Sequence, residues 1–319
     1  MPAPLIGLHH VTAICGDAQR NHDFYTGVLG LRLVKQTVNF DDPNSWHLYY
    51  GDTTGQPGTL MTFFAWPDGE GGQVGLDQFG SVLLGIPAKS LGFWIERLLG
   101  LGIAYQQPGR RFGERSVAFR DPDGLNLELV ALPDPPPCDP WEDSPVPVEH
   151  AIRGIHGVSL WANGDAAATF FSERLGFRDG GRESTTHRLS IGQGERTGVL
   201  DLVAATGLWP GSVAVGTIHH VAWAVADDEE LTAWQAELGA HDIDVTPIRD
   251  RTYFHSIYME TPGGAMVEMA TSGPGFTVDE DAASLGQHLQ LPPQLERQRL
   301  GLEGSLPPLV TILRQQRTS

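Results

Sequence analysis

Short apolar runs alternate with amphipathic segments along this chain, and the same order of elements occurs four times. Each repeat opens with an apolar run typical of a buried strand, continues with a helix that ends at glycine, and closes with strands around a glycine-containing turn. The repeats open near residues 5, 81, 155 and 218, and their helices are predicted over residues 21–29, 91–99, 166–175 and 229–238. The pattern predicts four similar modules and an α+β fold.

Two segments lie outside the repeats. Residues 133–150 are rich in proline and acidic residues, which predicts a linker between an N-terminal half (1–132) and a C-terminal half (151–275), each of two modules. Residues 276–319 contain two Pro-Pro pairs and a short helix predicted over residues 294–300. We expect this tail to wrap the body and to contribute no chemistry.

The dipeptide His-His occurs at the same place in the opening strands of the first and fourth modules. It is found as His9-His10 and as His219-His220, each followed by valine. Alternation along a strand puts His10 and His220 on equivalent faces and their preceding histidines on the opposite faces. His9 and His219 are therefore predicted to pack, or to orient a ligand by hydrogen bonding, and His9 is kept as a candidate for such a role.

The closing strands of the modules offer a carboxylate at a second shared position. The residues there are Thr62, Glu128, Asp201 and Glu268, whereas the position of His10 and His220 is occupied by Ser81 and Gly157 in the other two modules. Pairing modules in chain order would leave each pair one histidine short. Pairing the first module with the fourth, and the second with the third, brings His10, His220 and Glu268 into one barrel.

Two histidines and one carboxylate around a cation form the arrangement of non-haem Fe(II) oxygenases, which leaves coordination positions open. We therefore predict a metal site of His10, His220 and Glu268. The alternative is that both histidines are hydrogen-bonded core residues and Glu268 a partly exposed strand residue, because buried polar groups need only a partner. Recurrence at matching positions favours the metal site. Glu128 is the competing carboxylate, but its module has Ser81 where a histidine is required.

A turn signal in the fourth module places an aromatic residue beside this site. Tyr258 and Glu268 are equally distant from Gly263 in Pro262-Gly263-Gly264. A hairpin would put them opposite each other on one face, so Tyr258 is predicted to overlook the metal. The matching place in the second module is Ala118, which supports a single catalytic barrel. The alternative for Tyr258 is cross-strand aromatic packing.

Charge and composition narrow the partners. The formal net charge is −18 and Lys35 and Lys89 are the only lysines, so nucleic acid and anionic membranes are disfavoured as partners. No window is apolar enough to span a bilayer and no signal peptide is evident, so we expect a cytoplasmic protein. Cys15 and Cys138 are too few for a disulfide framework. The sequence leaves the oligomeric state open, a homo-oligomer included.

Five motifs stand at defined places in this order of elements. They are His9-His10-Val11-Thr12, residues 24–43, residues 250–258, Pro262-Gly263-Gly264 and Glu268. Over roughly residues 5–276 the chain resembles the vicinal oxygen chelate superfamily, in which βαβββ modules pair into open barrels that hold a metal. Within that superfamily it is most similar to ring-cleaving dioxygenases that act on hydroquinones.

The resemblance implies an activity and further site residues. It implies an Fe(II)-dependent, extradiol-type dioxygenase that inserts both atoms of O2 into a hydroquinone-type or catechol-type aromatic diol, with Mn(II) able to substitute because N/O ligands discriminate little between these ions. It places Arg251 near a substrate oxygen, where Arg251 and Tyr258 would stabilise negative charge. His255 stands where arginine is expected and is a candidate proton relay, although its strand parity differs from that of Tyr258.

Two other functions on the same scaffold remain open at this point. One is a metal-dependent isomerase or thiol transferase resembling glyoxalase I or the fosfomycin-resistance proteins. Glyoxalase-type sites prefer a fourth protein ligand, and the sequence offers no evident one. The other is a metal-free protein that sequesters a ligand, as bleomycin-resistance proteins do. The retained histidines and glutamate argue against it.

Overall fold

The four modules are present in the computed structural model, which describes residues 2–193 and 196–311. The first comprises β1 Gly7–Cys15, α1 Ala18–His22, β2 Arg32–Asn39, β3 Asp42–Gly51 and β4 Leu60–Ala65. The second comprises β5 Gln78–Pro87, α2 Leu91–Gly100, β6 Gly109–Arg111, β7 Glu114–Arg120 and β8 Asn126–Leu132. The third comprises β9 Ile155–Ala162, α3 Ala166–Thr169, β10 Arg178–Glu183, β11 Thr186–Gln193 and β12 Arg196–Ala204. The fourth comprises β13 Ile218–Val225, α4 Asp228–Gly239, β14 Arg249–Asp250, β15 Phe254–Glu260 and β16 Met266–Pro274.

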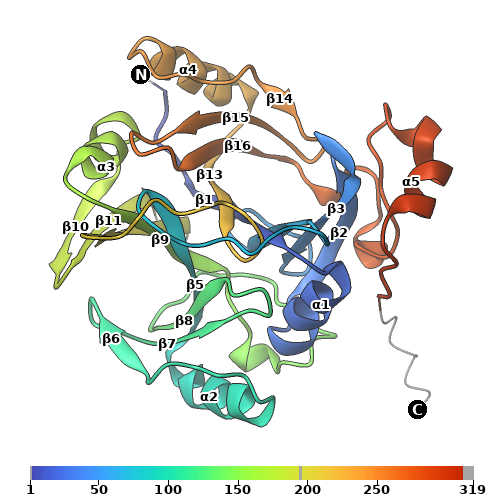
Figure 1. The fold of residues 1–319 in the computed structure, drawn as a ribbon, viewed down its shortest axis with the longest axis horizontal. Helices are drawn as coiled ribbons and strands as arrows, with labels where there is room; N and C mark the ends of the chain where they lie inside the picture. Colours follow the sequence, from blue (N-terminus) through green and yellow to red (C-terminus); the bar gives the residue numbers. More distant parts are fainter. Residues whose placement is uncertain (1, 194–195, 312–319) are drawn as a thin grey trace.

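The strands form two sheets of eight, and each sheet joins two modules (Figure 1). One has the order β14-β15-β16-β13-β1-β4-β3-β2 and combines the first module with the fourth. The other has the order β10-β11-β12-β9-β5-β8-β7-β6 and combines the second with the third. The predicted α+β fold of paired modules, first with fourth and second with third, is confirmed.

In each sheet, the two modules are joined by an antiparallel pair of their opening strands. β1 lies antiparallel to β13 with Val11 opposite Val221, and β5 lies antiparallel to β9 with Val82 opposite Val158. Within each module the opening strand is parallel to the closing strand. The equivalence of opening and closing strands that the sequence indicated is therefore present in three dimensions.

The helices differ in detail from the sequence prediction. α1 begins at Ala18, before the predicted start at residue 21, because the Asp17 carboxylate accepts a hydrogen bond from the Arg20 N–H and caps the helix. It then widens into a π-helical segment, Asp23–Val28, where the Thr26 hydroxyl donates to the His22 carbonyl. A second π-helical segment, Phe170–Arg174, follows α3. These wide turns lie inside the segments predicted as plain helices.

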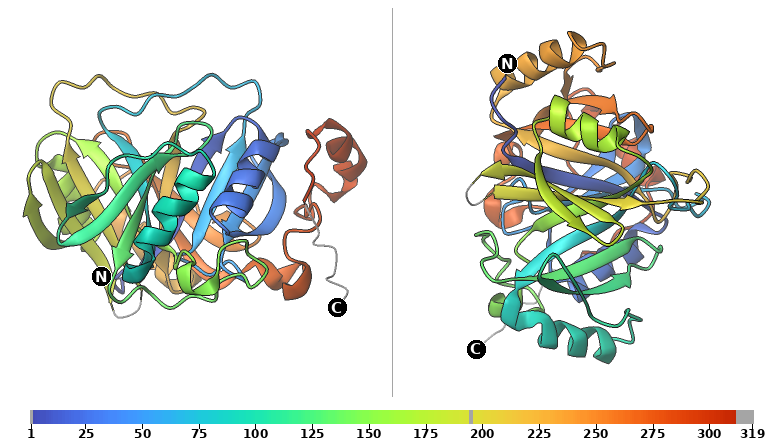
Figure 2. Two further views of the ribbon diagram at one scale, coloured as in Figure 1. Left: turned by 90° about the horizontal axis from the view of Figure 1, so that it is seen from below. Right: turned by 90° about the vertical axis from the view of Figure 1, so that its left-hand side faces the viewer.

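The tail lies along the outer edge of the first module (Figure 2), where Leu289 forms a parallel bridge with Gln36 of β2. It contains short 3₁₀ turns at Phe276–Val278, Ala282–Ser284 and Glu296–Gln298, then α5 Arg299–Ser305. The prediction of a helix over residues 294–300 was wrong in position, because α5 begins at Arg299. Pro292 and Pro293 lack the backbone N–H that a helix interior requires. The α-helix forms further along the chain, where Leu302 is buried.

The segments between the halves and between the modules contain little regular structure. Residues 133–150 hold only the 3₁₀ turn Val148–His150. A continuous apolar core runs through both sheets and includes Phe63, Trp94, Phe171 and Trp223. Over the residues that the structure describes, no helix combines the length and the hydrophobicity needed to cross a lipid bilayer.

Candidate metal centre and its cavity

A cavity of about 320 Å³ opens on the concave side of the sheet that joins the first and fourth modules. The first module supplies one wall and the fourth supplies the other. The lining residues are His10, Asn39, Phe40, Asp41, His47, Tyr49, Phe64, His219, His220, Thr246, Arg249, Arg251, Phe254, Tyr258 and Met266. These lining residues all come from the first and fourth modules.

Sheet register brings the three predicted ligands together. His10 on β1 lies beside Ala222 on β13, and Ala222 lies beside Glu268 on β16. Neighbours across a sheet point to the same face, as does His220, two residues before Ala222. The small Ala222 side chain between them leaves room for the two rings and the carboxylate to converge.

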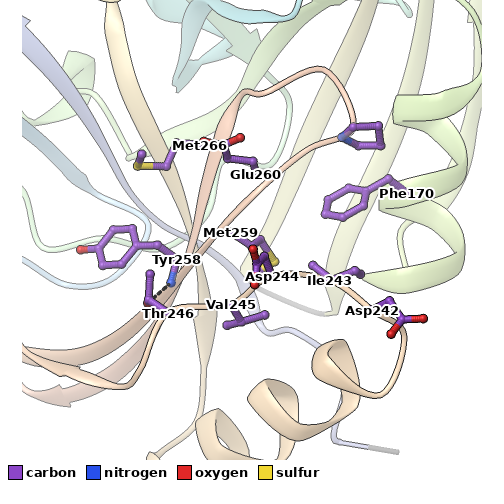
Figure 3. Close-up of a pocket in the computed structure, with 11 residues that line it drawn as sticks. Phe170, Asp242, Ile243, Asp244, Val245, Thr246, Tyr258, Met259, Glu260 and Met266 are labelled. Carbon is purple, nitrogen blue, oxygen red and sulfur yellow. Dashed lines mark hydrogen bonds between the residues drawn. The ribbon is translucent and has the colours of Figure 1, made fainter.

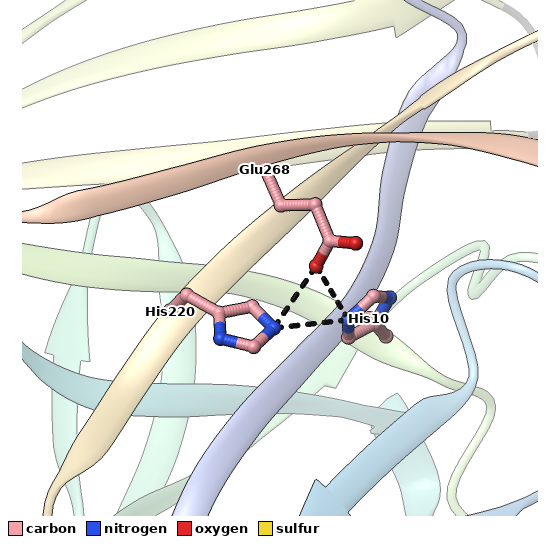
Figure 4. A group of neighbouring side chains, drawn as sticks. All are labelled: His10, His220 and Glu268. Carbon is pink, nitrogen blue, oxygen red and sulfur yellow. Dashed lines mark hydrogen bonds and ion pairs between the residues drawn. The ribbon is translucent and has the colours of Figure 1, made fainter. Parts of the chain in front are cut away.

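The three side chains meet at one point (Figure 4). Oε2 of Glu268 lies 3.0 Å from Nε2 of His10 and 2.9 Å from Nε2 of His220, and the two Nε2 atoms are 3.3 Å apart. All three residues are buried. Among the residues that the structure describes, they form the one group of three or more metal-ligating side chains this close together.

Glu268 has the surroundings of a cation ligand. It is fully buried, and neither of its oxygens has a donor in hydrogen-bond geometry within the described part of the chain. A buried carboxylate without donors is costly, so the donor set fits a bound divalent cation.

The preceding histidines support the two rings. Nδ1 of His9 lies 2.8 Å from Nδ1 of His10, and Nε2 of His9 lies 3.1 Å from the Thr271 carbonyl. A neutral His9 must donate from Nε2 to that carbonyl, so its Nδ1 accepts from His10 and leaves a lone pair on Nε2 of His10. Nδ1 of His219 lies 2.8 Å from Nδ1 of His220 in the same way.

His219 stays neutral in this environment. Burial and the neighbouring His220 lower the pKa of His219 to about 3. Its ring lies edge-on to both His220 and Phe64, with centroids at 5.0 and 5.4 Å. From the sequence, His9 and His219 were predicted either to pack or to orient a ligand. Their Nδ1 contacts to His10 and His220 fit an orienting role.

Tyr258 and Arg251 lie on the wall of the fourth module. Tyr258 pairs with Glu268 across β15 and β16, as the turn at Gly263 predicted. Nε of Arg251 donates to the Tyr258 hydroxyl at 3.2 Å, and both Nη atoms reach Asp41 at 3.1 and 3.2 Å. Burial raises the pKa of Tyr258, and Glu268 adds to this, so the phenol keeps its proton.

His255 is not brought into this cavity. Its Nδ1 lies 2.6 Å from Asp228 and its Nε2 lies 3.8 Å from Asp250, both of which are exposed. Its position on β15 has the opposite parity to that of Tyr258, which directs the side chain to the other face. The structure therefore gives no contact through which His255 could exchange a proton with the centre.

The cavity residues that were not identified from the sequence include His47 and Tyr49 on β3. The Tyr49 hydroxyl lies 3.0 Å from Nδ1 of His47, and Nε2 of His47 lies 3.0 Å from the Thr62 hydroxyl. Tyr49 pairs with Thr62 just as Tyr258 pairs with Glu268. The sequence comparison did not lead to Tyr49, because Tyr258 and Ala118 each stand ten residues before the closing-strand position, whereas Tyr49 stands thirteen residues before Thr62.

The other sheet has charged groups at the equivalent place. The Asp201 carboxylate, fully buried, receives hydrogen bonds from Arg188 at 2.7 and 2.9 Å and from Arg111 at 3.1 Å. Arg111 also reaches Glu128 at 3.0 Å, and Ser116 donates to Glu128. Arginine side chains thus occupy the place that a cation would take.

A larger cavity of about 620 Å³ lies next to the first (Figure 3). The two share Thr246, Tyr258 and Met266 as lining residues. Figure 3 shows the Tyr258 hydroxyl directed away from Phe170, which lies across the larger cavity. Tyr258 therefore presents its hydroxyl to the metal-side cavity.

Comparisons with known proteins agree with this geometry. A family model described as "Glyoxalase/Bleomycin resistance protein/Dioxygenase superfamily" matches residues 7–129 and 158–269. The chain is 40% identical over 309 residues to "Putative ring-cleaving dioxygenase MhqO" of Bacillus subtilis, covering 97% of this chain and 98% of the relative. It is 33% identical over 303 residues to "Chlorohydroquinone/hydroquinone 1,2-dioxygenase" of Sphingobium indicum, covering 93% and 94%.

Solved structures show the same fold. A crystal structure described as a "putative dioxygenase from Bacillus subtilis subsp. subtilis str. 168" matches with a TM-score of 0.91 at 39% identity, covering 96% of this chain and 98% of that one. Glyoxalase I from Zea mays matches with a TM-score of 0.62 at 17% identity, covering 83% and 92%. The second likeness concerns the fold alone.

Proposed function

Because the chain belongs to the glyoxalase/bleomycin resistance protein/dioxygenase superfamily, we propose that it is an Fe(II)-dependent dioxygenase that cleaves the ring of a hydroquinone-type diol. The convergence of His10, His220 and Glu268 at one buried point carries the proposal. The names of full-length relatives support ring cleavage, and one relative is named for chlorohydroquinone and hydroquinone. A catechol-type diol is the related substrate class.

The three side chains would hold the ion on one face. Bound Fe(II) would supply a Lewis-acidic centre with open positions at which a phenolic oxygen and dioxygen can meet. Three N/O ligands discriminate little between Fe(II) and Mn(II), so the same residues would also hold Mn(II). His9 and His219 would keep the ligand rings oriented through their Nδ1 contacts.

Tyr258 and Arg251 would stabilise negative charge on the substrate oxygen. Arg251 donates from Nε to the oxygen of Tyr258, so the Tyr258 proton is available to a cavity oxygen. Burial lowers the pKa of Arg251, but the Asp41 carboxylate and the hydrogen bond to Tyr258 raise it above its usual value, so the guanidinium keeps its charge. Fixed donors beside a developing charge act as an oxyanion site does. The reaction breaks one ring C–C bond and places both O2 atoms in the product.

The alternatives on this fold fit the cavity less well. A glyoxalase-type centre prefers a fourth protein ligand, and the position that corresponds to Glu268 in the first module is Thr62, whose hydroxyl is bonded to Thr12 at 2.7 Å. A metal-free binding protein would leave Glu268 buried without donors. Both alternatives also predict that no oxygen is consumed.

Oxygen uptake after anaerobic loading with Fe(II) tests the proposal. We expect uptake with hydroquinone and with chlorinated or methylated hydroquinones, and one O2 consumed per ring opened. Uptake with catechol alone would redirect the assignment to ortho-diols. Uptake with none of these diols, from protein that retains iron, would remove the dioxygenase assignment.

A further inference from the structure

Tyr49 and Tyr258 are related by the internal symmetry of the barrel. Tyr49 pairs with Thr62 and Tyr258 pairs with Glu268, and Thr62 and Glu268 hold the same place in the closing strands of their modules. Both tyrosines line the cavity, one from each wall. Burial raises the pKa of Tyr49 well above its usual value, so this phenol also keeps its proton. The candidate centre thus lies between two tyrosine side chains.

Tyr49 is held in a fixed position. Its ring lies against His47, with centroids 4.1 Å apart, and against Phe276 from the tail at 5.1 Å. Its hydroxyl is bonded to Nδ1 of His47, which is itself tied through Nε2 to the Thr62 hydroxyl. A phenol can donate one hydrogen bond and accept others, so Tyr49 retains an acceptor position for a ligand whichever way the His47 bond runs.

The two tyrosines differ in electrostatic surroundings. Tyr258 is bonded to the cationic Arg251, whereas the bonded partner of Tyr49 is an imidazole. Burial lowers the pKa of His47 well below its usual value, so that ring is neutral. The wall of Tyr258 suits an oxygen that carries negative charge, and the wall of Tyr49 suits a hydroxyl that keeps its proton.

Each of the two hydroxyl groups of a para-diol needs its own polar partner in the cavity. Its two oxygens point in opposite directions, so only one of them can reach the metal and the other requires a polar partner on the cavity surface. Asp41 is already engaged by Arg251, and both Asp41 and Arg249 are exposed at the mouth. Tyr49 is buried, fixed and polar, with hydrogen-bonding capacity to spare.

We infer that Tyr49, held by His47, binds the second hydroxyl of the substrate and so selects a para-diol. This inference rests on the proposed function, because it assumes that an aromatic diol occupies the cavity. The proposed contact is a single hydrogen bond between uncharged groups, in which the substrate O–H donates to the Tyr49 oxygen. Such a bond within a buried site contributes a preference of about 5- to 10-fold in binding.

The test compares two ligands and two proteins. Hydroquinone and phenol differ by the second hydroxyl, and Tyr49→Phe removes its proposed partner. Anaerobic dissociation constants are measured with the Fe(II)-loaded protein by calorimetry. Wild type should bind hydroquinone about 5- to 10-fold more tightly than phenol, and Tyr49→Phe should lose that preference while binding phenol as wild type does.

Tyr50 supplies a matched control on the same strand. It is buried one residue further along on the opposite face, and its hydroxyl has no hydrogen-bond partner among the described residues. Tyr50→Phe should therefore keep the full preference for hydroquinone. An unchanged preference in Tyr49→Phe, or its equal loss in Tyr50→Phe, would overturn the inference. Oxygen uptake by wild type with hydroquinone in the same preparation would show that the proposed function stands independently.

Discussion

Four side chains occupy one place in the closing strands, and the neighbours of each decide its role. Glu268 lies between two histidines and lacks donors among the described residues, which suits a cation. Asp201 and Glu128 are neutralised by arginines. Thr62 bonds to a second threonine and to His47. Among the described residues, this shared position therefore offers a ligand set for a cation in the sheet of the first and fourth modules, and carboxylates paired with arginine in the other sheet.

The convergence of His10, His220 and Glu268 could be predicted from the sequence, and the surroundings of these side chains only in part. His10, His220 and Glu268 were accessible because repetition and strand parity constrain them. The bond of Arg251 to Tyr258 and Asp41 depends on a turn from another module, which local pattern does not reveal. His47 and Tyr49 lie in a strand whose register depends on the β3–β4 pairing, so their place in the cavity emerged only from the fold.

Asp121 gives a pH-dependent stability that can be measured apart from the metal centre. Burial raises the pKa of Asp121 to about 6, although the N–H groups of Leu125 and Asp123 oppose this. In the unfolded chain its pKa is roughly 3.9, so the folded state binds the proton more tightly and the resulting stability is present below that value and lost as pH rises to about 6.

Asp121→Asn should remove this contribution. The difference in unfolding free energy between wild type and variant should change by roughly 2–3 kcal/mol between pH 4 and 6 and be constant above pH 6.5. Urea denaturation of the metal-free proteins measures it. Asp134→Asn in the exposed 133–150 segment is the control and should give a constant difference. A constant difference for Asp121→Asn as well would contradict the raised pKa.

The strand pair β11–β12 depends on a buried ion pair. Arg188 donates to Asp201 from β11 and also reaches Glu114 at 2.6 Å. Removing one partner of a buried ion pair leaves an uncompensated buried charge. This lowers the free energy of unfolding more than replacing both partners by apolar residues does. Arg188 thus supplies the positive charge that compensates Asp201, and it stabilises the pairing of β11 with β12.

Arg188→Ala should lower the free energy of unfolding by about 3 kcal/mol. The neighbouring Arg182 on β10 is exposed and pairs with the exposed Asp165 at 3.6 Å, so Arg182→Ala should leave stability unchanged within measurement error. Urea denaturation compares the two variants. Equal, small effects would show that the cluster does not support the sheet.

Helix boundaries were the least predictable elements. Capping by Asp17 and the Thr26 hydroxyl set where α1 begins and widens, and both effects involve single hydrogen bonds that apolar periodicity does not register. The position of α5 depends on burial of Leu302 against the body, a tertiary effect. By contrast, the pairing of the modules could be predicted from the sequence, because only one pairing brought both histidines and Glu268 together.

The tail is fastened to the first module by a buried charge cluster. Lys35 is fully buried, lies 2.5 Å from Asp279, and also contacts Glu280. Gln36 on the same strand bonds the Gly286 carbonyl at 2.6 Å. Phe276 stacks on Tyr253 and contacts Tyr49, so the tail supports the cavity wall although it lines none of it.

Lys35→Met should loosen this attachment, because two carboxylates lose their counter-charge. Amide hydrogen exchange over residues 276–290 should accelerate by at least tenfold, while exchange in β5–β9 stays unchanged. Lys89, the only other lysine, is exposed, and Lys89→Met is the matched control. Unchanged protection of residues 276–290 in Lys35→Met would show that the cluster does not hold the tail.

Anaerobic titration with Fe(II), followed by iron analysis after desalting, tests most directly that distant modules build one metal centre. We predict one iron per chain for wild type, none for His220→Ala, and one for the control His241→Ala, whose histidine is exposed at the end of α4. Two irons per wild-type chain, or one iron retained by His220→Ala, would contradict the account.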